Sequence, residues 1–189
     1  STKQMTPTLK QRYDFTMALK ARMGEQFNVF GRGIRPINDK SEAMDDFRYH
    51  IAVENHIAPG FWTEKIADCF LAYCVPFYYG PEDVAGLFPK GSVIPIDIYD
   101  IDGAEAIIRE EIKPGSYEAR LPAITQAREQ ILERHNLMTY IARKAAKLYN
   151  PALKASGKGT IMGRHKFRQS HPIRAAQDIA HRARFNHIR

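Results

Sequence analysis

The stretch that decides the fold is Arg48-Tyr-His-Ile-Ala-Val-Glu-Asn55, followed closely by Gly60-Phe-Trp-Thr-Glu-Lys65. The first part is a nearly unbroken apolar run that ends in a carboxylate and an amide, which is typical of a strand buried in a parallel sheet. Thr63 is a favourable N-cap, so we expect a helix to begin directly after it. In an open α/β sheet, ligands bind outside the carboxyl ends of the strands, where the free N–H groups of a helix N-terminus favour phosphate. This stretch therefore predicts a site for a nucleotide at the polar end of the strand.

Strands and helices are expected to alternate along the rest of residues 1–150. The helix after Thr63 should bury one stripe of side chains at helical spacing, namely Ile66, Cys69, Phe70 and Tyr73. The other expected strands are residues 27–30, 75–79 and 93–96, in addition to 49–53. The other expected helices run from Thr6-Pro7 to Met23 with Phe15, Leu19 and Met23 buried, from Asp39 or Ser41 to Met44, and from an N-cap at Asp102 to Ile112. A helical pair should follow, carrying Leu121, Ile124 and Ile131 and then Leu137, Tyr140, Ile141 and Leu148, with Pro122 in a first turn or at a kink. This alternation predicts an α/β fold with a doubly wound parallel sheet.

The composition indicates one globular domain followed by a basic tail. The chain has 189 residues, of which 44% are hydrophobic and 26% charged, and no apolar run approaches the length of a membrane span. The net charge of +7 comes from residues 156–189, which hold eight Lys or Arg and one acid. We therefore predict a domain at 1–150 and a basic tail at 151–189, with a flexible break at 156–159 and a basic helix at 171–188. Two cysteines, Cys69 and Cys74, form no disulfide framework, so a reducing compartment is expected.

Four blocks carry a resemblance to a known family: His50-Ile-Ala-Val-Glu-Asn55, Gly60-Phe-Trp-Thr-Glu-Lys-Ile66, Val75-Pro-Phe-Tyr-Tyr-Gly80 and Phe88-Pro-Lys-Gly-Ser-Val-Ile94. In order and spacing they resemble the α-1,3/α-1,4-fucosyltransferases, over about residues 1–145. The resemblance implies a GT-B enzyme with two Rossmann-like domains, of which this chain is similar to the C-terminal, GDP-fucose-binding one. The N-terminal domain would supply the acceptor site and the catalytic base, so no catalytic residue is expected in this chain.

The resemblance also implies roles for individual donor-binding residues. Arg12 would contact the diphosphate, and Glu54 and Asn55 would form the strand-end pair. In Thr63-Glu64-Lys65, the glutamate would contact donor hydroxyls and the lysine the phosphates. Phe61 occupies a position that is often tyrosine in the family, so one hydrogen bond to the nucleotide would be missing. GDP-fucose is the expected donor, and neither a metal nor a tightly bound cofactor is expected.

The sequence thus predicts the donor-binding domain of an inverting fucosyltransferase that acts on a hydroxyl of an N-acetylglucosamine or glucose-type acceptor. Expected partners are GDP-fucose, the glycan acceptor, the N-terminal domain and, through residues 156–189, an anionic membrane surface. The tail could instead brace the N-terminal domain, while nucleic acid is disfavoured because no aromatic residues interleave its charges. The expected location is the cytoplasm, with peripheral membrane attachment, or the Golgi lumen in a eukaryote.

Several alternatives remain open at this point. The domain could bind another GDP-sugar, or it could be a nucleotide-binding or interaction module without catalysis. Glu54 and Glu64 could be the acid–base pair of a glycosidase, although nothing in the sequence fixes their separation. Tyr78 and Tyr79, at the end of an expected strand, could serve either the core or stacking against a ligand.

Overall fold

The computed structural model describes residues 7–31, 33–152 and 162–177, and the chain divides into two compact units, Ser1–Lys147 and Leu148–Arg189. The first unit holds the sheet. Its helices are α1 (Pro7–Met23), α2 (Glu64–Leu71), α3 (Ile101–Glu111), α4 (Ser116–Gln130) and most of α5 (Leu137–Leu148), with short 3-10 helices η1 (Gly24–Gln26), η2 (Lys40–Ala43) and η3 (Glu82–Leu87) and a π-helical turn η4 (Ile131–His135). The second unit contains α6 (Arg164–Ser170), and residues 172–177 are also helical.

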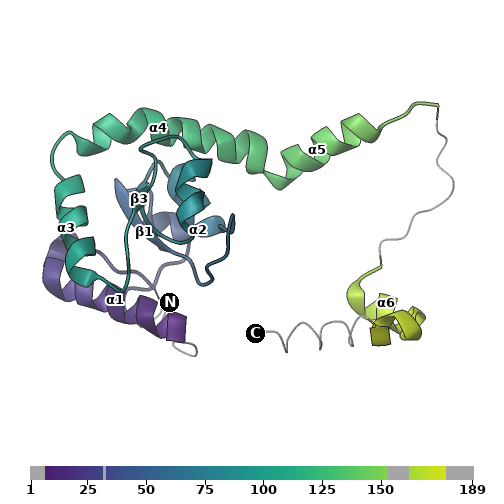
Figure 1. The fold of residues 1–189 in the computed structure, drawn as a ribbon, viewed down its shortest axis with the longest axis horizontal. Helices are drawn as coiled ribbons and strands as arrows, with labels where there is room; N and C mark the ends of the chain where they lie inside the picture. The colour runs from purple at the N-terminus through teal and green to yellow at the C-terminus, as the bar shows by residue number, and fades with distance from the viewer. Residues whose placement is uncertain (1–6, 32, 153–161, 178–189) are drawn as a thin grey trace. The chain divides into compact units, whose positions relative to one another are not determined.

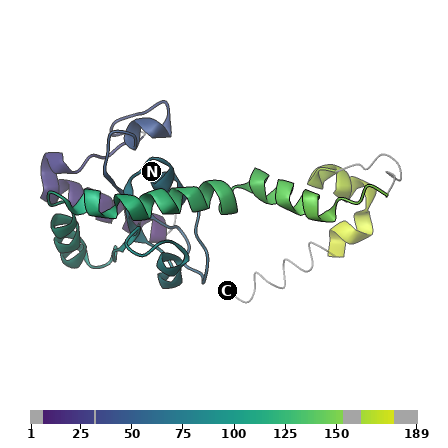
Figure 2. The same cartoon turned by 90° about the horizontal axis from the view of Figure 1, so that it is seen from above.

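The sheet has three parallel strands in the order β1 (Tyr49–Val53), β2 (Val75–Tyr79) and β3 (Ile94–Pro95). Helix α2 covers one face, while α1 and α3 lie on the other (Figure 1). Figure 2 shows α4 crossing over these layers, where it contacts α2 and β2. The prediction of an α/β fold with a parallel sheet covered on both faces is confirmed.

The predicted strand at 27–30 is wrong. Residues 28–30 form no ladder, and the only pairing nearby among the described residues is an isolated bridge between Gly31 and Arg35. Phe27 and Phe30 still pack against the core. Residues 26–31 line the same hollow as β1, so the segment faces the free edge of β1 across open space instead of joining the sheet.

The predicted buried stripes are largely confirmed. Phe15, Leu19 and Met23 of α1 are buried, as are Ile66, Cys69 and Phe70 of α2. Tyr73 was wrongly placed on the α2 stripe. It follows the helix end with a left-handed φ of 57° and is 39% exposed, because the chain reverses there to enter β2.

Two helix caps follow the sequence signals, and two other predictions about helix starts need correction. Thr63 caps α2, accepting from the backbone N–H of Lys65, and Asp39 caps η2. The cap of α3 is Asp100, whose side chain accepts from the N–H of Gly103, and not Asp102, which lies in the first turn. Helix α4 begins after Gly115, which has a φ of 87°, so Pro122 lies in its second turn and not in its first.

The predicted helical pair is present, but its second member buries no side chain. Ile124 and Ile131 are buried, whereas Leu137, Tyr140, Ile141 and Leu148 are each at least 50% exposed. Of the predicted basic helix at 171–188, residues 172–177 are helical and 178–189 lie outside the described residues, as does the predicted break at 156–159. Within the described ranges, no helix combines the length and apolar character needed to cross a bilayer.

Candidate functional site

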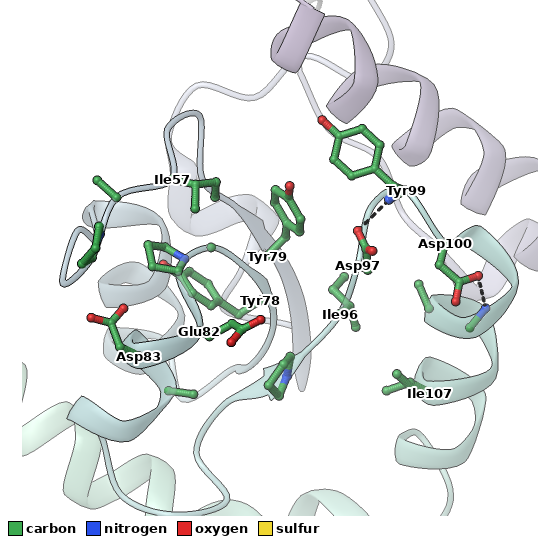
Figure 3. Close-up of a pocket in the computed structure, with 18 residues that line it drawn as sticks. Ile57, Tyr78, Tyr79, Glu82, Asp83, Ile96, Asp97, Tyr99, Asp100 and Ile107 are labelled. Atoms are coloured by element: carbon green, nitrogen blue, oxygen red, sulfur yellow. Dashed lines mark hydrogen bonds between the residues drawn. The ribbon is translucent and has the colours of Figure 1, made fainter. Parts of the chain in front are cut away.

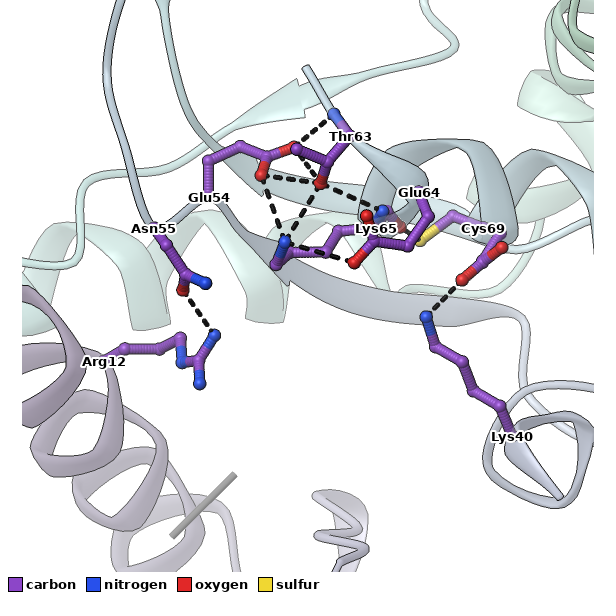
Figure 4. Close-up of polar contacts among 9 residues, drawn as sticks. Arg12, Lys40, Glu54, Asn55, Thr63, Glu64, Lys65 and Cys69 are labelled. Carbon is purple, nitrogen blue, oxygen red and sulfur yellow. Dashed lines mark hydrogen bonds and ion pairs between the residues drawn. The ribbon is translucent and has the colours of Figure 1, made fainter. Parts of the chain in front are cut away.

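The polar end of β1 and the first turn of α2 come together as one cluster. The sheet pairing continues past β1, because the N–H of Glu54 donates to the carbonyl of Tyr79 over 2.8 Å. The loop that follows returns the chain so that Thr63 caps α2 directly beside Glu54. We call Arg12, Glu54, Asn55, Thr63, Glu64 and Lys65 the strand-end cluster (Figure 4).

Glu54 is fully buried at the centre of this cluster. Its Oε1 accepts from the N–H of Thr63 (2.9 Å), and its two oxygens accept from the Thr63 hydroxyl (3.0 and 2.8 Å). The ammonium of Lys65 lies 3.3 Å from Glu54 Oε2 and 3.0 Å from Thr63 Oγ1. A buried carboxylate needs such donors because it is costly to desolvate without them. Glu54 therefore fixes both the helix cap and the position of Lys65.

Arg12 reaches the cluster from α1. Its Nη1 donates to Asn55 Oδ1 over 2.7 Å, linking residues 43 positions apart in the chain. Burial lowers the pKa of Arg12, but an arginine in a protein keeps its charge. The contact leaves the remaining guanidinium N–H groups available to an anion.

Glu64 lies at the outer side of the cluster, 3.3 Å from the ammonium of Lys65, with its side chain 65% exposed. Partial burial acts to raise the pKa of Glu64, but a backbone hydrogen bond and the charge of Lys65 hold it below its usual value. Glu64 is thus an ionised, accessible acceptor for hydroxyl groups. Glu54 is completely buried and hydrogen-bonded, so the two carboxylates do not form a pair that faces one substrate, which argues against the glycosidase reading.

A hollow of about 700 Å³ opens along the free edge of β1, between α1, the start of α2 and a segment that contributes residues 26–31, Ile34 and Ile37. We call it the edge hollow. Arg12, Glu64 and Lys65 line it together with apolar side chains that include Phe27, Phe30 and Ile37. Asn55 does not line it but is held against Arg12. The volume is in the usual range for a small-molecule site, and a mixed apolar and cationic wall suits a nucleoside diphosphate.

Sequence reasoning missed two further cations of the edge hollow. Arg48 is paired with Glu118 over 3.1 Å. The second cation is Lys40. It lies in η2, directly after the cap Asp39, and its ammonium is paired with Asp68 of α2. Its only sequence signal is its position in a capped turn, because its approach to α2 depends on tertiary packing.

Phe61 does not belong to the hydrogen-bonded cluster. It is 40% exposed and packs edge-on against His56, with ring centroids 5.6 Å apart. Its proposed place beside the donor stays a prediction. No group of three His, Cys, Asp or Glu side chains in the described part of the chain could hold a metal ion.

Comparisons with known proteins find similarity to fucosyltransferases. The family model for glycosyltransferase family 10 (fucosyltransferase), C-terminal part, matches residues 3–107. An α-(1,3)-fucosyltransferase, FucT of Helicobacter pylori, is 32% identical over 82 residues, which cover 43% of this chain and 16% of that protein. Crystal structures of α1,3-fucosyltransferase with GDP-fucose and with GDP are each 25% identical, with TM-scores of 0.49 and 0.48. They match 61% of this chain and 36% and 35% of those chains. Because the family model spans more than half of the sequence, the chain belongs to the fucosyltransferases of glycosyltransferase family 10, and residues 3–107 correspond to the family's C-terminal domain.

Proposed function

We propose that this chain binds GDP-fucose and is the donor-binding domain of an inverting fucosyltransferase. The observation that carries the proposal is that Arg12 and Lys65, from two different helices, line one hollow along the free edge of β1. Lys65 lies in the first turn of α2. A cation there opposes the helix dipole, which is favourable only if an anion or a carboxylate offsets it. Glu54 offsets it within the fold, and the diphosphate would add its charge from the open side.

The proposed roles follow from the contacts. Arg12 and Lys65 would hold the diphosphate and stabilise the charge that builds on GDP as the bond to the sugar breaks. Glu64 would orient hydroxyl groups of ribose and fucose, because a carboxylate can accept from them. Asn55, which does not line the hollow, would hold Arg12 in place through its side-chain oxygen. Glu54 and Thr63 would act indirectly, by holding the ammonium of Lys65 in position. Inversion requires in-line attack by an acceptor hydroxyl, and we assign its base to the N-terminal domain of the whole enzyme and to no residue of this chain.

The activity of the whole protein is part of the proposal, since the chain aligns with only 16% of the H. pylori relative. We propose transfer to an N-acetylglucosamine or glucose-type acceptor in α-1,3 or α-1,4 linkage, with the N-terminal acceptor domain as partner. Cys69 and Cys74 are both buried and free of disulfide bonds, which supports a reducing compartment such as the cytoplasm. The basic residues 156–189 support attachment to an anionic membrane surface.

The test is calorimetric titration of GDP into the wild-type chain and into Lys65→Ala. We expect the substitution to weaken GDP binding more than about tenfold, the loss typical of a charge-assisted hydrogen bond to a phosphate. The matched control is Lys113→Ala, which also removes a lysine from an ion pair, but one on the exposed surface after α3.

A second variant tests the proposed phosphate contact made from the other helix. Arg12→Met removes the other phosphate contact from α1 and should weaken GDP to a similar degree. Circular dichroism of both variants checks that the fold is kept. Unchanged GDP affinity in two folded variants would refute the proposed roles.

A further inference from the structure

Lys40 lies on the wall of the edge hollow but outside the strand-end cluster. It is the first residue of η2, a short turn in which Asp39 accepts from the N–H of Ser41 (2.8 Å) and Glu42 accepts from the N–H of Asp39 (3.0 Å). The backbone of Lys40 is therefore held in place, whereas its ammonium lies at the end of a flexible four-carbon stem. This ammonium is paired with Asp68 of α2 (Figure 4).

The pairing with Asp68 places the ammonium close to the residues proposed to hold the donor. Residues four positions apart are neighbours on one face of a helix, so Asp68 lies beside Glu64 in the next turn of α2. The charge of Lys40 acts there: burial works to raise the pKa of Glu64, while a backbone hydrogen bond, the charge of Lys65 and, more weakly, that of Lys40 lower it. Lys40 is thus near enough to the first turn of α2 to exchange Asp68 for an anion bound there.

The cations of the edge hollow are not equally available to a ligand. The ammonium of Lys65 is already offset by Glu54, which is fully buried and cannot lose its partner without leaving a buried charge. Arg12 contacts the neutral amide of Asn55 and no carboxylate among the described residues. Because a nucleotide sugar carries a negative charge on each phosphate, the guanidinium of Arg12 alone does not balance it. A further cation is needed.

Of the two other cations that line the hollow, Lys40 and Arg48, only Lys40 is near the polar end of β1. Arg48 precedes β1, whose five residues span roughly 16 Å. It is paired with Glu118 over 3.1 Å and lies over the ring of Tyr117. The side chains of Lys40 and Asp68 are 54% and 27% exposed, so water can solvate the carboxylate once the ammonium leaves, and such a pair is weak. A phosphate can therefore replace Asp68 at little cost.

A second hollow, of about 920 Å³, opens where β2 and β3 end (Figure 3). Four carboxylates line it, from Glu82, Asp83, Asp97 and Asp100, and none of its described lining residues is a lysine or arginine. Such a surface repels an anion. The phosphates of the donor are therefore expected in the edge hollow, where Lys40 lies.

We infer that Lys40 is a further donor-binding residue, whose ammonium leaves Asp68 and binds a phosphate oxygen of the nucleotide sugar. The inference rests on the proposed function, because it needs a diphosphate beside Arg12 and Lys65. Asp68 competes with that diphosphate for the ammonium. The two members of this ion pair should therefore have opposite effects on affinity, which a purely structural contact between η2 and α2 would not produce.

The experiment is calorimetric titration of GDP into the full chain, as wild type and as variants of the pair. We expect Lys40→Met to weaken GDP about fivefold, because the loss of a charge-assisted hydrogen bond outweighs the release from a weak surface ion pair. Asp68→Asn should tighten GDP about twofold, because the competing carboxylate is gone. Lys40→Arg keeps the charge and should restore most of the affinity that Lys40→Met loses.

The matched controls are Lys113→Met and Glu110→Gln, the two members of an ion pair whose side chains are 59% and 70% exposed. They change the net charge of the chain by the same amounts and should leave GDP affinity unchanged. Circular dichroism checks the fold of every variant. Because Asp68→Asn has to tighten binding, a variant that only loses structure cannot imitate the expected result.

The inference and the proposed function can fail separately. Absence of GDP binding in the wild type would overturn both. GDP binding that depends on Lys65 and not on Lys40 would overturn the present inference alone. Equal weakening by Lys40→Met and Asp68→Asn would also overturn it, because the pair would then only hold η2 against α2, and so would effects no larger than those of the two controls.

Discussion

The ion pair between Glu54 and Lys65 yields a prediction whose size follows from the structure. Replacing Glu54 by glutamine keeps the shape of the side chain but removes its charge. The amide then directs an N–H₂ group at either Thr63 or the ammonium of Lys65, both of which are donors in the native contacts. Because Glu54 is fully buried, water cannot compensate for the lost acceptor.

We expect Glu54→Gln to lower the free energy of unfolding by about 2 kcal/mol. Breaking a buried ion pair costs roughly 3–5 kcal/mol, but Lys65 is 20% exposed and lies 3.3 Å from Glu64, which retains part of its pairing. In a double-mutant cycle with Lys65→Met, the coupling energy should be on the order of 1–2 kcal/mol. Most of the coupling should persist in high salt, because salt screens a largely buried pair less than an exposed one.

The assay is urea unfolding of the wild type, both single variants and the double variant. The control cycle uses Glu110→Gln and Lys113→Met, an ion pair whose side chains are 70% and 59% exposed. An exposed pair of this kind should couple by less than about 0.5 kcal/mol. If the Glu54–Lys65 coupling were no larger than that of the control, the claim that Glu54 fixes Lys65 would be refuted.

Three further predictions concern the donor site and the fold. Phe61→Tyr should tighten GDP binding by up to about fivefold, because it restores one hydrogen bond; calorimetry that shows no gain would remove Phe61 from the site. Asp100→Ala should destabilise the domain by about 1 kcal/mol through loss of the α3 cap, while Asp102→Ala, which loses only a surface ion pair, should cost less than half as much in urea unfolding. Burial, together with the charge of Lys40, lowers the pKa of His50 from 6.5 to about 4. Between these pH values the unfolded chain binds a proton that the folded chain does not, so the free energy of unfolding should fall by up to about 3 kcal/mol as the pH drops through this range. His50→Gln should reduce that slope, and an identical pH dependence would contradict the assignment.

Local sequence signals were sufficient to predict the two central strands and the cap of α2. The strands at 49–53 and 75–79 were predicted with their observed bounds, and Thr63 was identified as the cap of α2. Each has a complete local signature: an apolar run for a strand, or a hydroxyl before an amphipathic stretch for a cap.

The errors lie where the outcome depends on other parts of the chain. Residues 27–30 have the composition of a strand, but a strand also requires a partner, and the edge hollow separates them from β1. Asp100 and Asp102 are both acceptable caps by residue type, and in the structure it is Asp100 whose side chain accepts from the N–H of Gly103. The exposure of Tyr73 follows from a reversal of the chain that periodicity does not report.

The residues of the candidate site also fall into those that local sequence predicts and those whose position depends on tertiary packing. Glu54, Asn55, Thr63, Glu64 and Lys65 are close in sequence, and their grouping could be predicted from one strand end and one cap. Arg12 entered only through the family resemblance, because nothing local links it to Asn55. Lys40 was missed, since its place in the edge hollow depends on the packing of η2 against α2.

The most direct test of the central claim is a thermal-shift panel of the full chain with GDP, UDP, ADP and GDP-fucose. Any ligand that binds only the folded state raises the melting temperature, by an amount that grows with the logarithm of its concentration divided by its Kd. We predict that GDP and GDP-fucose raise it and that UDP and ADP do not. Stabilisation by UDP without stabilisation by GDP would contradict the donor assignment.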